Sequence, residues 1–302
     1  MSQKRRLFYT DHHELPLPPD HKFPIRKYRL TRDLLERDGF YTFEPAPLAP
    51  REIIELVHDS RYVEEFLTGT LPPQTVRRIG FPWSEQLVTR TLASVGGTLA
   101  ATEEAIAHGL GGTLAGGTHH AFRSEGSGYC VFNDIAVAIQ NLRYKLRISR
   151  AAVVDLDVHQ GDGTASIFEE DRGVLTVSVH AATNFPFRKQ RSKIDIELAD
   201  ETADEQYLEA VQTVIPQVFA FQPDIVYFQA GVDPLESDRL GKLSVSHKGL
   251  QKRDELVIRA CKERKVPLVI TLGGGYGEPI EDTAKAHANT YRTAAHLFGR
   301  IA

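Results

Sequence analysis

The sequence is poor in cysteine, because its 302 residues include only Cys130 and Cys261. Two cysteines at this spacing match no zinc or redox motif, and they are too few for a disulfide framework. We therefore expect a reducing, cytoplasmic location. No apolar run approaches the ~18 residues of a membrane span, and no apolar segment indicates a signal peptide at the N-terminus. The sequence thus predicts neither a membrane protein nor a secreted one.

Excess positive charge is also absent. Lys and Arg number 36 against 40 Asp and Glu, which gives a formal net charge of −4. This balance argues against a protein that binds nucleic acid or a membrane surface. One short basic cluster, Lys4–Arg6, is expected to lie in a solvated terminus. The hydrophobic content of 41% and the charged content of 25% are typical of a soluble globular protein.

Repeats, low-complexity linkers and breaks in composition are missing as well. Three proline-rich pieces, ELPLPPD, EPAPLAP and LPPQ, are too short to link domains. All three lie in the first quarter of the chain, which we therefore expect to be rich in loops. Because no break divides it, we expect the chain to form one domain.

The sequence does contain a regular alternation of strand and helix patterns. Apolar, β-branched runs predict strands at Ala151–Val158, Gly173–Val179, Asp224–Ala230 and Val266–Leu272. Helical periodicity predicts helices at Arg26–Arg37, Arg51–Leu67, Trp83–His108, Asn133–Arg147, Gly163–Glu169, Asp204–Phe221, Ser246–Arg264 and Glu278–Phe298. This alternation predicts an α/β fold with a parallel sheet and helices on both faces.

Polar and titratable residues gather where the predicted strands end. The four strand ends carry the segments DLDVHQGDG, SVHAATNF, GVDPLESD and GGGYGEP. In open parallel sheets, ligands bind beyond the carboxyl ends of the strands. The sequence therefore predicts a functional site at this edge of the sheet.

A metal site is one interpretation of these segments. Asp155, Asp157 and His159 alternate at a strand end, so their side chains point to one face and can hold one cation. With Asp233 after another strand, Asp157 and His159 complete the three-ligand set of a catalytic zinc site. Magnesium, manganese or Fe(II) would accept a similar set. The alternatives are that the aspartates cap helices or start turns, and that the histidine is a surface residue.

Two adjacent histidines, His119 and His120, lie in the segment AGGTHHAF. Histidine titrates near neutral pH, as a general base must. A carboxylate on the other ring nitrogen sets the tautomer and basicity of such a histidine. Asp155 and Asp162 are left over at the same sheet edge for this task. The sequence therefore predicts two His–Asp dyads beside a metal, with a surface histidine pair as the alternative.

Tyr276 follows three glycines in LGGGYG. The spacing lacks the third glycine of a dinucleotide fingerprint, and no P-loop Lys-Ser/Thr follows, so nucleotide binding is not favoured. The glycines instead allow the backbone to approach a site closely. Tyr276 can then donate its hydroxyl to a developing oxyanion. No G-x-S-x-G nucleophile motif is present, and Cys130 lies in an apolar context typical of an inert thiol.

The remaining candidates have two interpretations each. Gly128, Tyr129 and Phe185 either pack in the core or form the wall of an apolar channel. Ser178, at the end of the second strand, is either simply hydrogen-bonded or helps to hold a second, structural cation near Asp155.

Taken together, these motifs resemble those of the histone deacetylase superfamily. GGTHHA, GSGYCVFND, VVDLDVHQGDGTA, SVH, GVDPLESDRLGKLSVS and LGGGY occur there in the same order, and the resemblance runs from about LPLPPDHKFPIRKYRL to Tyr276. DPLESDRLGKLS and the following KRDELV are most similar to the class IV branch and its bacterial relatives. The resemblance implies an arginase/deacetylase-like fold, with a single catalytic domain over residues 1–302.

Residue by residue, the resemblance implies a zinc ion with three ligands: Asp157, His159 and Asp233. His120, backed by Asp162, would be the main general base. His119, backed by Asp155, would be an electrostatic or proton-donating partner, and Tyr276 would polarise the scissile carbonyl. The implied channel wall consists of Gly128, Tyr129 and, as a less close match, Phe185. An implied potassium ion would be held by Asp155, Ser178, Val179 and the carbonyls of Asp157 and His159.

The implied activity is zinc-dependent hydrolysis of the amide bond of acylated lysine side chains, with acetyl or longer fatty acyl groups. An alternative is a small-molecule amidase acting on acetylated polyamines or related amines, although we find no extra acidic residues for its channel mouth. A binding scaffold would not need the intact metal and acid–base residues. A ureohydrolase-like binuclear manganese enzyme would need more carboxylates and would leave Tyr276 without a role. The expected partner is thus an acyl-lysine peptide or protein, or an acylated small amine, and not a nucleic acid. The oligomeric state is unknown from the sequence.

Overall fold

A single eight-stranded sheet forms the centre of the molecule. The computed structural model describes residues 3–301 and orders the strands β2-β1-β3-β8-β7-β4-β5-β6, with every neighbouring pair parallel. The strands are β1 (Arg5–Tyr9), β2 (Tyr41–Pro45), β3 (Leu110–Thr113), β4 (Ala151–Asp155), β5 (Val174–Ala181), β6 (Ile194–Leu198), β7 (Ile225–Gln229) and β8 (Leu268–Thr271). The predicted α/β fold is confirmed.

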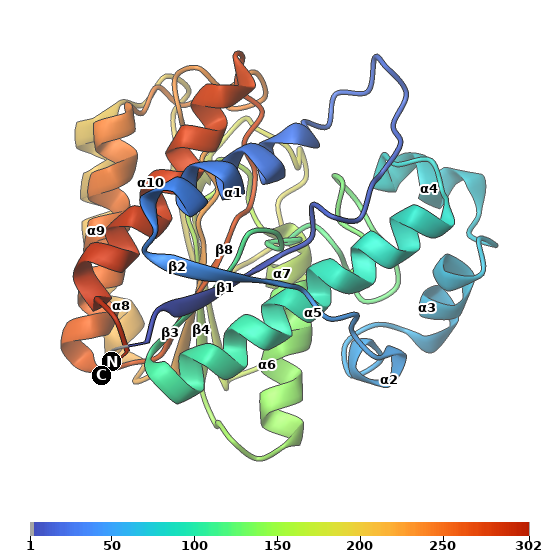
Figure 1. Cartoon of the computed structure of the whole chain (residues 1–302), viewed down its shortest axis with the longest axis horizontal. Coiled ribbons are helices and arrows are strands. Elements are labelled where there is room, and N and C mark those ends of the chain that lie inside the picture. Colours follow the sequence, from blue (N-terminus) through green and yellow to red (C-terminus); the bar gives the residue numbers. More distant parts are fainter. Residues whose placement is uncertain (1–2, 302) are drawn as a thin grey trace.

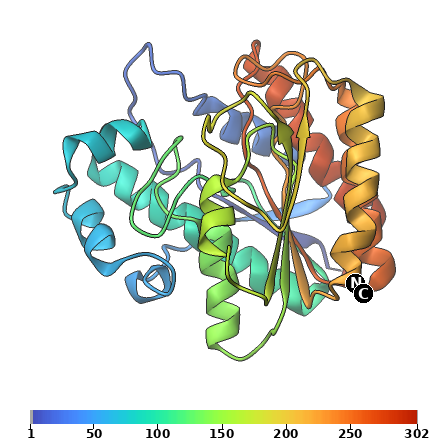
Figure 2. The ribbon, with the colours of Figure 1, turned by 180° about the vertical axis from the view of Figure 1, so that it is seen from behind.

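Helices cover both faces of this sheet. They are α1 (Arg26–Asp38), α2 (Arg51–Ile54), α3 (Ser60–Leu67), α4 (Pro73–Ile79), α5 (Glu85–His108), α6 (Asp134–Tyr144), α7 (Asp162–Ile167), α8 (Asp204–Ala220), α9 (His247–Arg264) and α10 (Ile280–Phe298). Figures 1 and 2 show α5, α6 and α7 on one face and α1, α8, α9 and α10 on the other. The short helices α2, α3 and α4 lie further out on the α5 side.

The central strands are buried on both sides, and their alternate residues enter two different cores. In β4, Ala152 and Val154 belong to the core under α8 and α9, whereas Ala151 and Val153 belong to the core under α5 and α6. A strand with apolar neighbours on both faces has a continuous apolar sequence. This is why β4, β5, β7 and β8 are predictable from the sequence.

The other four strands lack that signal, and two of them, β1 and β2, lie in the first quarter of the chain, where mainly loops were expected. Strands β1 and β2 pair with each other at one edge of the sheet, and β6 is the other edge, with alternating exposure. Strand β3 reads LGGT, which has little β propensity. Glycine is required there because a β carbon at Gly111 would collide with the carbonyl oxygen of Ala101 on α5.

The basic cluster Lys4–Arg6 is not a solvated terminus, and this prediction is wrong. It lies at the start of β1, and Arg5 is buried. The Arg5 guanidinium donates hydrogen bonds to the carbonyl oxygens of Gly299 at 2.9 Å and His108 at 2.8 Å. Arg6 forms ion pairs with Glu44 and Glu104. Arg5 thus caps the carboxyl ends of α5 and α10, where cations are favourable.

The predicted helix Arg51–Leu67 is in fact two helices. Helix α2 ends at Ile54, and α3 begins at Ser60 after Asp59, whose carboxylate accepts a hydrogen bond from the Arg61 N–H at 2.8 Å. This N-cap fixes the start of α3. Helix α4, which begins at Pro73, is absent from the sequence prediction. No helix between residues 3 and 301 is both long and apolar enough to cross a membrane.

Candidate active site

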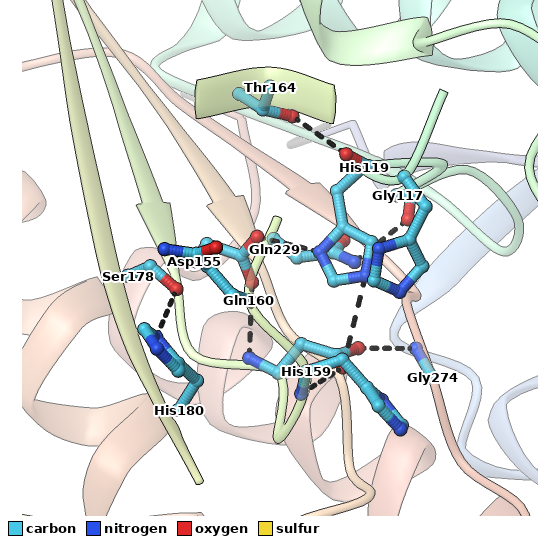
Figure 3. Close-up of polar contacts among 12 residues, drawn as sticks. Gly117, His119, Asp155, His159, Gln160, Thr164, Ser178, His180, Gln229 and Gly274 are labelled. Atoms are coloured by element: carbon cyan, nitrogen blue, oxygen red, sulfur yellow. Dashed lines mark hydrogen bonds and ion pairs between the residues drawn. The ribbon is translucent and has the colours of Figure 1, made fainter. Parts of the chain in front are cut away.

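The carboxyl ends of β4, β7 and β8 converge with the loop that follows β3. Figure 3 shows His119, Asp155, His159 and Gly274 gathered at this edge from separate segments of the chain. The geometry follows from the parallel register, in which β4 and β7 end at the paired residues Asp155 and Gln229. Polar residues that are far apart in the sequence are thereby brought into one buried cluster.

Asp157, His159 and Asp233 form a compact triad. One potential ligand atom from each lies within 4.8 Å of the others, and all three residues are buried. The Nδ1 atom of His159 lies 3.0 Å from Asp157 Oδ1 and 3.1 Å from Asp233 Oδ2. Between residues 3 and 301, no other three His, Cys, Asp or Glu side chains come together in this way.

The electrostatics of the triad indicate a place for a cation. Burial alone lowers the pKa of His159, but the Asp157 and Asp233 carboxylates outweigh burial and raise it to about 10. The imidazolium proton therefore occupies the position between two carboxylates that a metal would take. Burial and the charge on Asp157 raise the pKa of Asp233. Two buried carboxylates in contact repel each other unless a positive charge lies between them.

The donors around the triad fit a metal ion. Backbone N–H groups hold both carboxylates, with Val158 donating to Asp233 Oδ1 at 2.9 Å and Gly274 donating to Asp157 Oδ2 at 2.8 Å. Such outer contacts fix the orientation of metal ligands. A β carbon at Gly274 would collide with Asp233 Oδ2 and would stand 2.7 Å from Asp157 Oδ2, so it would displace both carboxylates. An O,N,O donor set with space for further ligands suits zinc, Fe(II) or manganese.

The two adjacent histidines each contact one aspartate. The Nδ1 atom of His119 lies 2.7 Å from Asp155 Oδ2, and that of His120 lies 2.6 Å from Asp162 Oδ1. All four side chains are buried, which excludes the surface-pair alternative. The His120 ring also stands edge-on to the His159 ring, with centroids 5.9 Å apart. Both pairings are the ones predicted from the sequence, and the roles assigned to them stay predictions.

The two histidines have opposite protonation preferences. Burial alone lowers the pKa of His119, but the charges of Asp155 and Asp157 outweigh burial and raise it to about 9. Burial and the charge on His119 lower the pKa of His120 to about 4, against the opposing effect of Asp162. His120 is thus neutral at pH 7 and can accept a proton. His119 is charged and can stabilise negative charge or donate.

Two residues not predicted from the sequence hold the segment before the histidines. The Asp134 carboxylate accepts N–H hydrogen bonds from Gly117 at 2.9 Å and Thr118 at 2.7 Å. The Gln229 side chain donates to the Gly117 carbonyl oxygen at 2.8 Å. Gly117 has a φ of 78°, a conformation that favours glycine. A buried glutamine at the end of an otherwise apolar strand is the signal that could have identified Gln229.

Tyr276 lies in the loop after β8, where two further unpredicted residues hold the backbone. The Asp238 carboxylate accepts the Tyr276 N–H at 2.6 Å, and the Lys27 ammonium donates to the carbonyl oxygens of Gly273 and Gly275 at 2.9 and 3.3 Å. Burial, together with the charges of Asp233 and Asp157, raises the pKa of the Tyr276 hydroxyl well above its ordinary range. The hydroxyl therefore stays protonated and is available as a hydrogen-bond donor.

A cavity of about 590 Å³ leads from the surface to these groups. His120, His159 and Tyr276 lie among its lining residues. All three predicted wall residues, Gly128, Tyr129 and Phe185, also line it. The Phe185 ring stands edge-on to His120 at a centroid distance of 4.9 Å. A β carbon at Gly128 would lie 2.8 Å from the His120 ring, so glycine keeps the passage open.

The predicted potassium site remains a prediction. Asp155 and Ser178 are paired in the β4–β5 register, so their backbones are adjacent, and Val179 follows in β5. The Ser178 hydroxyl is hydrogen-bonded to His180 Nδ1 at 2.9 Å, as Figure 3 shows. This contact fits the simpler interpretation of a hydrogen-bonded buried serine.

Comparison with known proteins gives a consistent result. Residues 21–293 match the family model of the histone deacetylase domain. The chain is 41% identical to an uncharacterized protein of Picosynechococcus sp., over 97% of this chain and 99% of that protein. It is 32% identical to histone deacetylase 2 of Arabidopsis thaliana, over 85% of this chain and 70% of the plant protein. It is 31% identical to acetoin utilization protein AcuC of Bacillus subtilis, over 75% of this chain and 65% of that protein.

Proposed function

Since the chain belongs to the histone deacetylase family, and is thereby an amidohydrolase of the deacetylase type, we propose that it uses zinc to hydrolyse acylated lysine side chains. One observation carries the proposal. His159 of the O,N,O triad, His120 of the unequal histidine pair and Tyr276 all line one cavity, and the other members of the triad and the pair are in contact with these residues or close to them. No single one of these features would suffice, but together they supply metal binding, proton transfer and oxyanion stabilisation.

Asp157, His159 and Asp233 would hold the metal. A divalent cation bound there supplies Lewis acidity toward the substrate carbonyl and toward water, whose pKa it lowers. The carboxylates and imidazole are already in contact, so binding requires deprotonation of His159 and little movement of the backbone. Gly231 and Gly274 leave the space that the ligands need, because a β carbon at Gly231 would displace Asp157 and one at Gly274 would displace Asp233 and Asp157.

The chain's own residues would carry the proton transfers. Neutral His120 accepts the proton of the attacking water, and Asp162 on Nδ1 keeps Nε2 free as the acceptor. Charged His119 stabilises the negative charge that develops and is the stronger candidate to protonate the leaving amine. The Tyr276 hydroxyl, which stays protonated, donates to the oxyanion. No covalent intermediate is needed.

The shape of the cavity suits a lysine side chain that carries an acyl group. Its wall includes Gly128, Tyr129 and Phe185, which would pack along an extended apolar stem. An acylated polyamine fits less well, because it carries further positive charges. The charged side chains at the outer part of the cavity, Arg78 and Lys242, are themselves positive. The structure thus favours acyl-lysine over the polyamine alternative.

A substrate panel tests the proposal. Lysine peptides bearing acyl groups from acetyl to myristoyl are compared with acetylated polyamines, using wild-type protein and the variants Tyr276→Phe and His120→Ala. We expect turnover of at least one acyl-lysine peptide and its loss in both variants. Polyamine turnover far above peptide turnover would favour the alternative, and unchanged turnover in both variants would overturn the mechanism.

A further inference from the structure

The charged side chains at the outer part of the cavity are all positive. Apart from His120 and His159, its only titratable lining side chains with a charge among residues 3–301 are Arg78, at the end of α4, and Lys242, in the loop before α9. No carboxylate from the same residues lines the cavity. The mouth also presents an apolar edge, formed by Phe187 and Leu240, with the Phe187 side chain almost fully exposed.

The two cations already have partners within the protein, but both stay partly exposed. Arg78 pairs with Glu125, whereas the Lys242 ammonium donates to the Thr183 hydroxyl and carbonyl oxygens at 2.6 and 3.4 Å and lies 3.6 Å from Asp200. Neither Glu125 nor Asp200 lines the cavity. A guanidinium has five N–H donors, and Glu125 engages only the Nη1 group of Arg78. The side chains of Arg78 and Lys242 are 44% and 45% exposed, so both remain accessible to a ligand at the mouth.

The neighbouring loop adds to the positive charge. Phe187 is followed by Arg188, which is exposed and forms no ion pair with any residue from 3 to 301. Lys189 donates to the carbonyl oxygens of Asn184 and Pro186 at 2.6 and 2.7 Å, which holds this loop in place. The segment 185–189 thus contains two cations and no carboxylate. Positive charge therefore extends from the cavity lining onto its rim.

We propose that the mouth recognises, through Arg78 and Lys242, a substrate carboxylate that lies near the α carbon of the acylated lysine. This inference rests on the proposed lysine deacylation. When the acylated side chain extends to the catalytic groups, whatever is attached to its α carbon lies at the mouth. The carboxylate is supplied either by an acidic residue beside the acyl-lysine in a polypeptide or by the α-carboxylate of a free Nε-acyl-lysine. Substrates with flanking lysines are disfavoured by like charge.

Matched peptides test the proposal. Three acetyl-lysine peptides of one length carry Glu, Gln or Lys on both sides of the acetyl-lysine, and free Nε-acetyl-lysine is compared with its α-amide. The value of kcat/KM is measured with the zinc-loaded enzyme in 0.1 and 0.5 M NaCl. Fluorescently labelled versions of the same peptides are used to measure Kd for the Tyr276→Phe variant by fluorescence anisotropy. This readout does not require turnover.

We expect kcat/KM and affinity to fall in the order Glu, Gln, Lys. Two exposed ion pairs of ordinary strength predict about a threefold to tenfold difference between the Glu and Lys peptides. Because the Debye length shortens with salt, this ratio should shrink in 0.5 M NaCl. A preference for free acetyl-lysine over its amide would identify the α-carboxylate as the source. A preference confined to the Glu peptide would identify an acidic polypeptide.

The double variant Arg78→Gln/Lys242→Gln should abolish the preference. The matched control is Arg259→Gln on α9, an exposed arginine that is ion-paired with Glu255 and lies away from the cavity. The control should retain the wild-type order of peptides. Retention of the full Glu-over-Lys ratio in the double variant would overturn the inference, as would equal or better binding of the Lys peptide by the wild type.

The two readouts separate this inference from the proposed function. A Glu preference in Kd without turnover of any peptide would support carboxylate recognition and contradict lysine deacylation. Turnover of all three peptides with equal kcat/KM would support deacylation and contradict carboxylate recognition. Absence of both binding and turnover would contradict both.

Discussion

The imidazole rings of His119 and His120 lie 4.1 Å apart, centroid to centroid, and each Nδ1 atom contacts an aspartate. Their pKa values nevertheless move in opposite directions, upward for His119 and downward for His120. Both histidines are buried. The difference arises because the Asp157 carboxylate also stabilises the protonated form of His119, whereas the charge on His119 destabilises the protonated form of His120. Two chemically identical neighbours thereby have opposite protonation preferences.

The first prediction concerns the neutral member of this pair. Replacement His120→Ala removes the proposed base, so kcat should fall about 10²- to 10⁴-fold, the usual contribution of a general base. Bound zinc should be unchanged, because His120 is not a ligand. Steady-state kinetics with an acetyl-lysine peptide, together with metal analysis, checks both expectations. A fall of less than threefold in kcat would show that His120 is not the general base.

A second prediction is that the substitution Asp233→Asn stabilises the metal-free protein but makes the protein less stable than the wild type when zinc is present. Burial and Asp157 raise the pKa of Asp233, so the stability linked to its protonated form is lost as pH rises through that pKa. At pH 8, metal-free Asp233→Asn should therefore unfold at a higher temperature than the metal-free wild type. Asn can still accept the Val158 N–H bond.

With zinc present the order should reverse. Zinc at 100 times its Kd stabilises the wild type by about 2.7 kcal/mol, and the variant should gain far less because it lacks one ligand. Thermal unfolding of both proteins with and without zinc makes the comparison. Equal zinc-induced stabilisation of the two proteins would show that Asp233 is not a ligand.

A third prediction tests the space around the ligands. A β carbon at Gly231 would stand 2.7 Å from Asp157 Cγ, so Gly231→Ala should displace that carboxylate. We expect zinc affinity to fall about 10- to 100-fold, as for other disturbances of ligand orientation. In the control Gly299→Ala, the new β carbon would lie in open space. This variant should lose only about 1 kcal/mol of stability through backbone strain, with zinc affinity unchanged. Competition with a chelator measures both affinities, and wild-type affinity in Gly231→Ala would contradict this geometry.

Much of this site was predictable because its chemistry lies in short segments at the ends of buried strands. The continuous apolar sequence of β4 and β7 identifies them, and Asp157, His159 and Asp233 directly follow them. Two His–Asp dyads were also predictable, since Asp155 and Asp162 were the carboxylates left over, whereas the family resemblance implied which aspartate backs which histidine. The local sequence therefore identifies those site residues that directly follow strongly predicted strands.

The residues that hold the site in place were not predictable, because they come from elements with no local functional signal. Lys27 lies on α1, about 250 residues before the loop that it supports, and an amphipathic helix gives no reason to single it out. From the sequence, Asp134 is expected only to be an acidic residue in the first turn of a helix, and in the structure it does occupy the first turn of α6. Arg5 reads as solvated until the sheet order places β1 beside β3. Such contacts depend on topology, which the sequence pattern leaves open.

A fourth prediction concerns stability and pH at a histidine remote from the site. His58 is buried and accepts a hydrogen bond from the Asn133 N–H at 2.9 Å. Burial lowers its pKa to about 4. The unfolded chain takes up this proton near pH 6.5 and the folded protein does not, so the free energy of unfolding should fall as pH drops from 6.5 toward 4, by about 1.4 kcal/mol per pH unit.

The variant His58→Gln isolates this contribution, because glutamine can accept the same hydrogen bond without titrating. Its destabilisation relative to the wild type should shrink by about 2 kcal/mol between pH 7.5 and pH 5. Urea unfolding at the two pH values measures the change. A difference between the two proteins that stays constant with pH would mean that His58 does not titrate in this way.

The central claim is that a metal held by Asp157, His159 and Asp233 acts together with His120 and Tyr276 on an acylated lysine. Its most direct test is the turnover of an acetyl-lysine peptide by metal-stripped protein during titration with zinc, with bound zinc measured in the same samples. We predict that turnover rises in proportion to bound zinc and reaches its maximum at about one equivalent, as the single triad requires. His120→Ala and Tyr276→Phe should bind the same equivalent with little turnover. Full turnover by the metal-free protein, or unchanged turnover in both zinc-loaded variants, would contradict the claim.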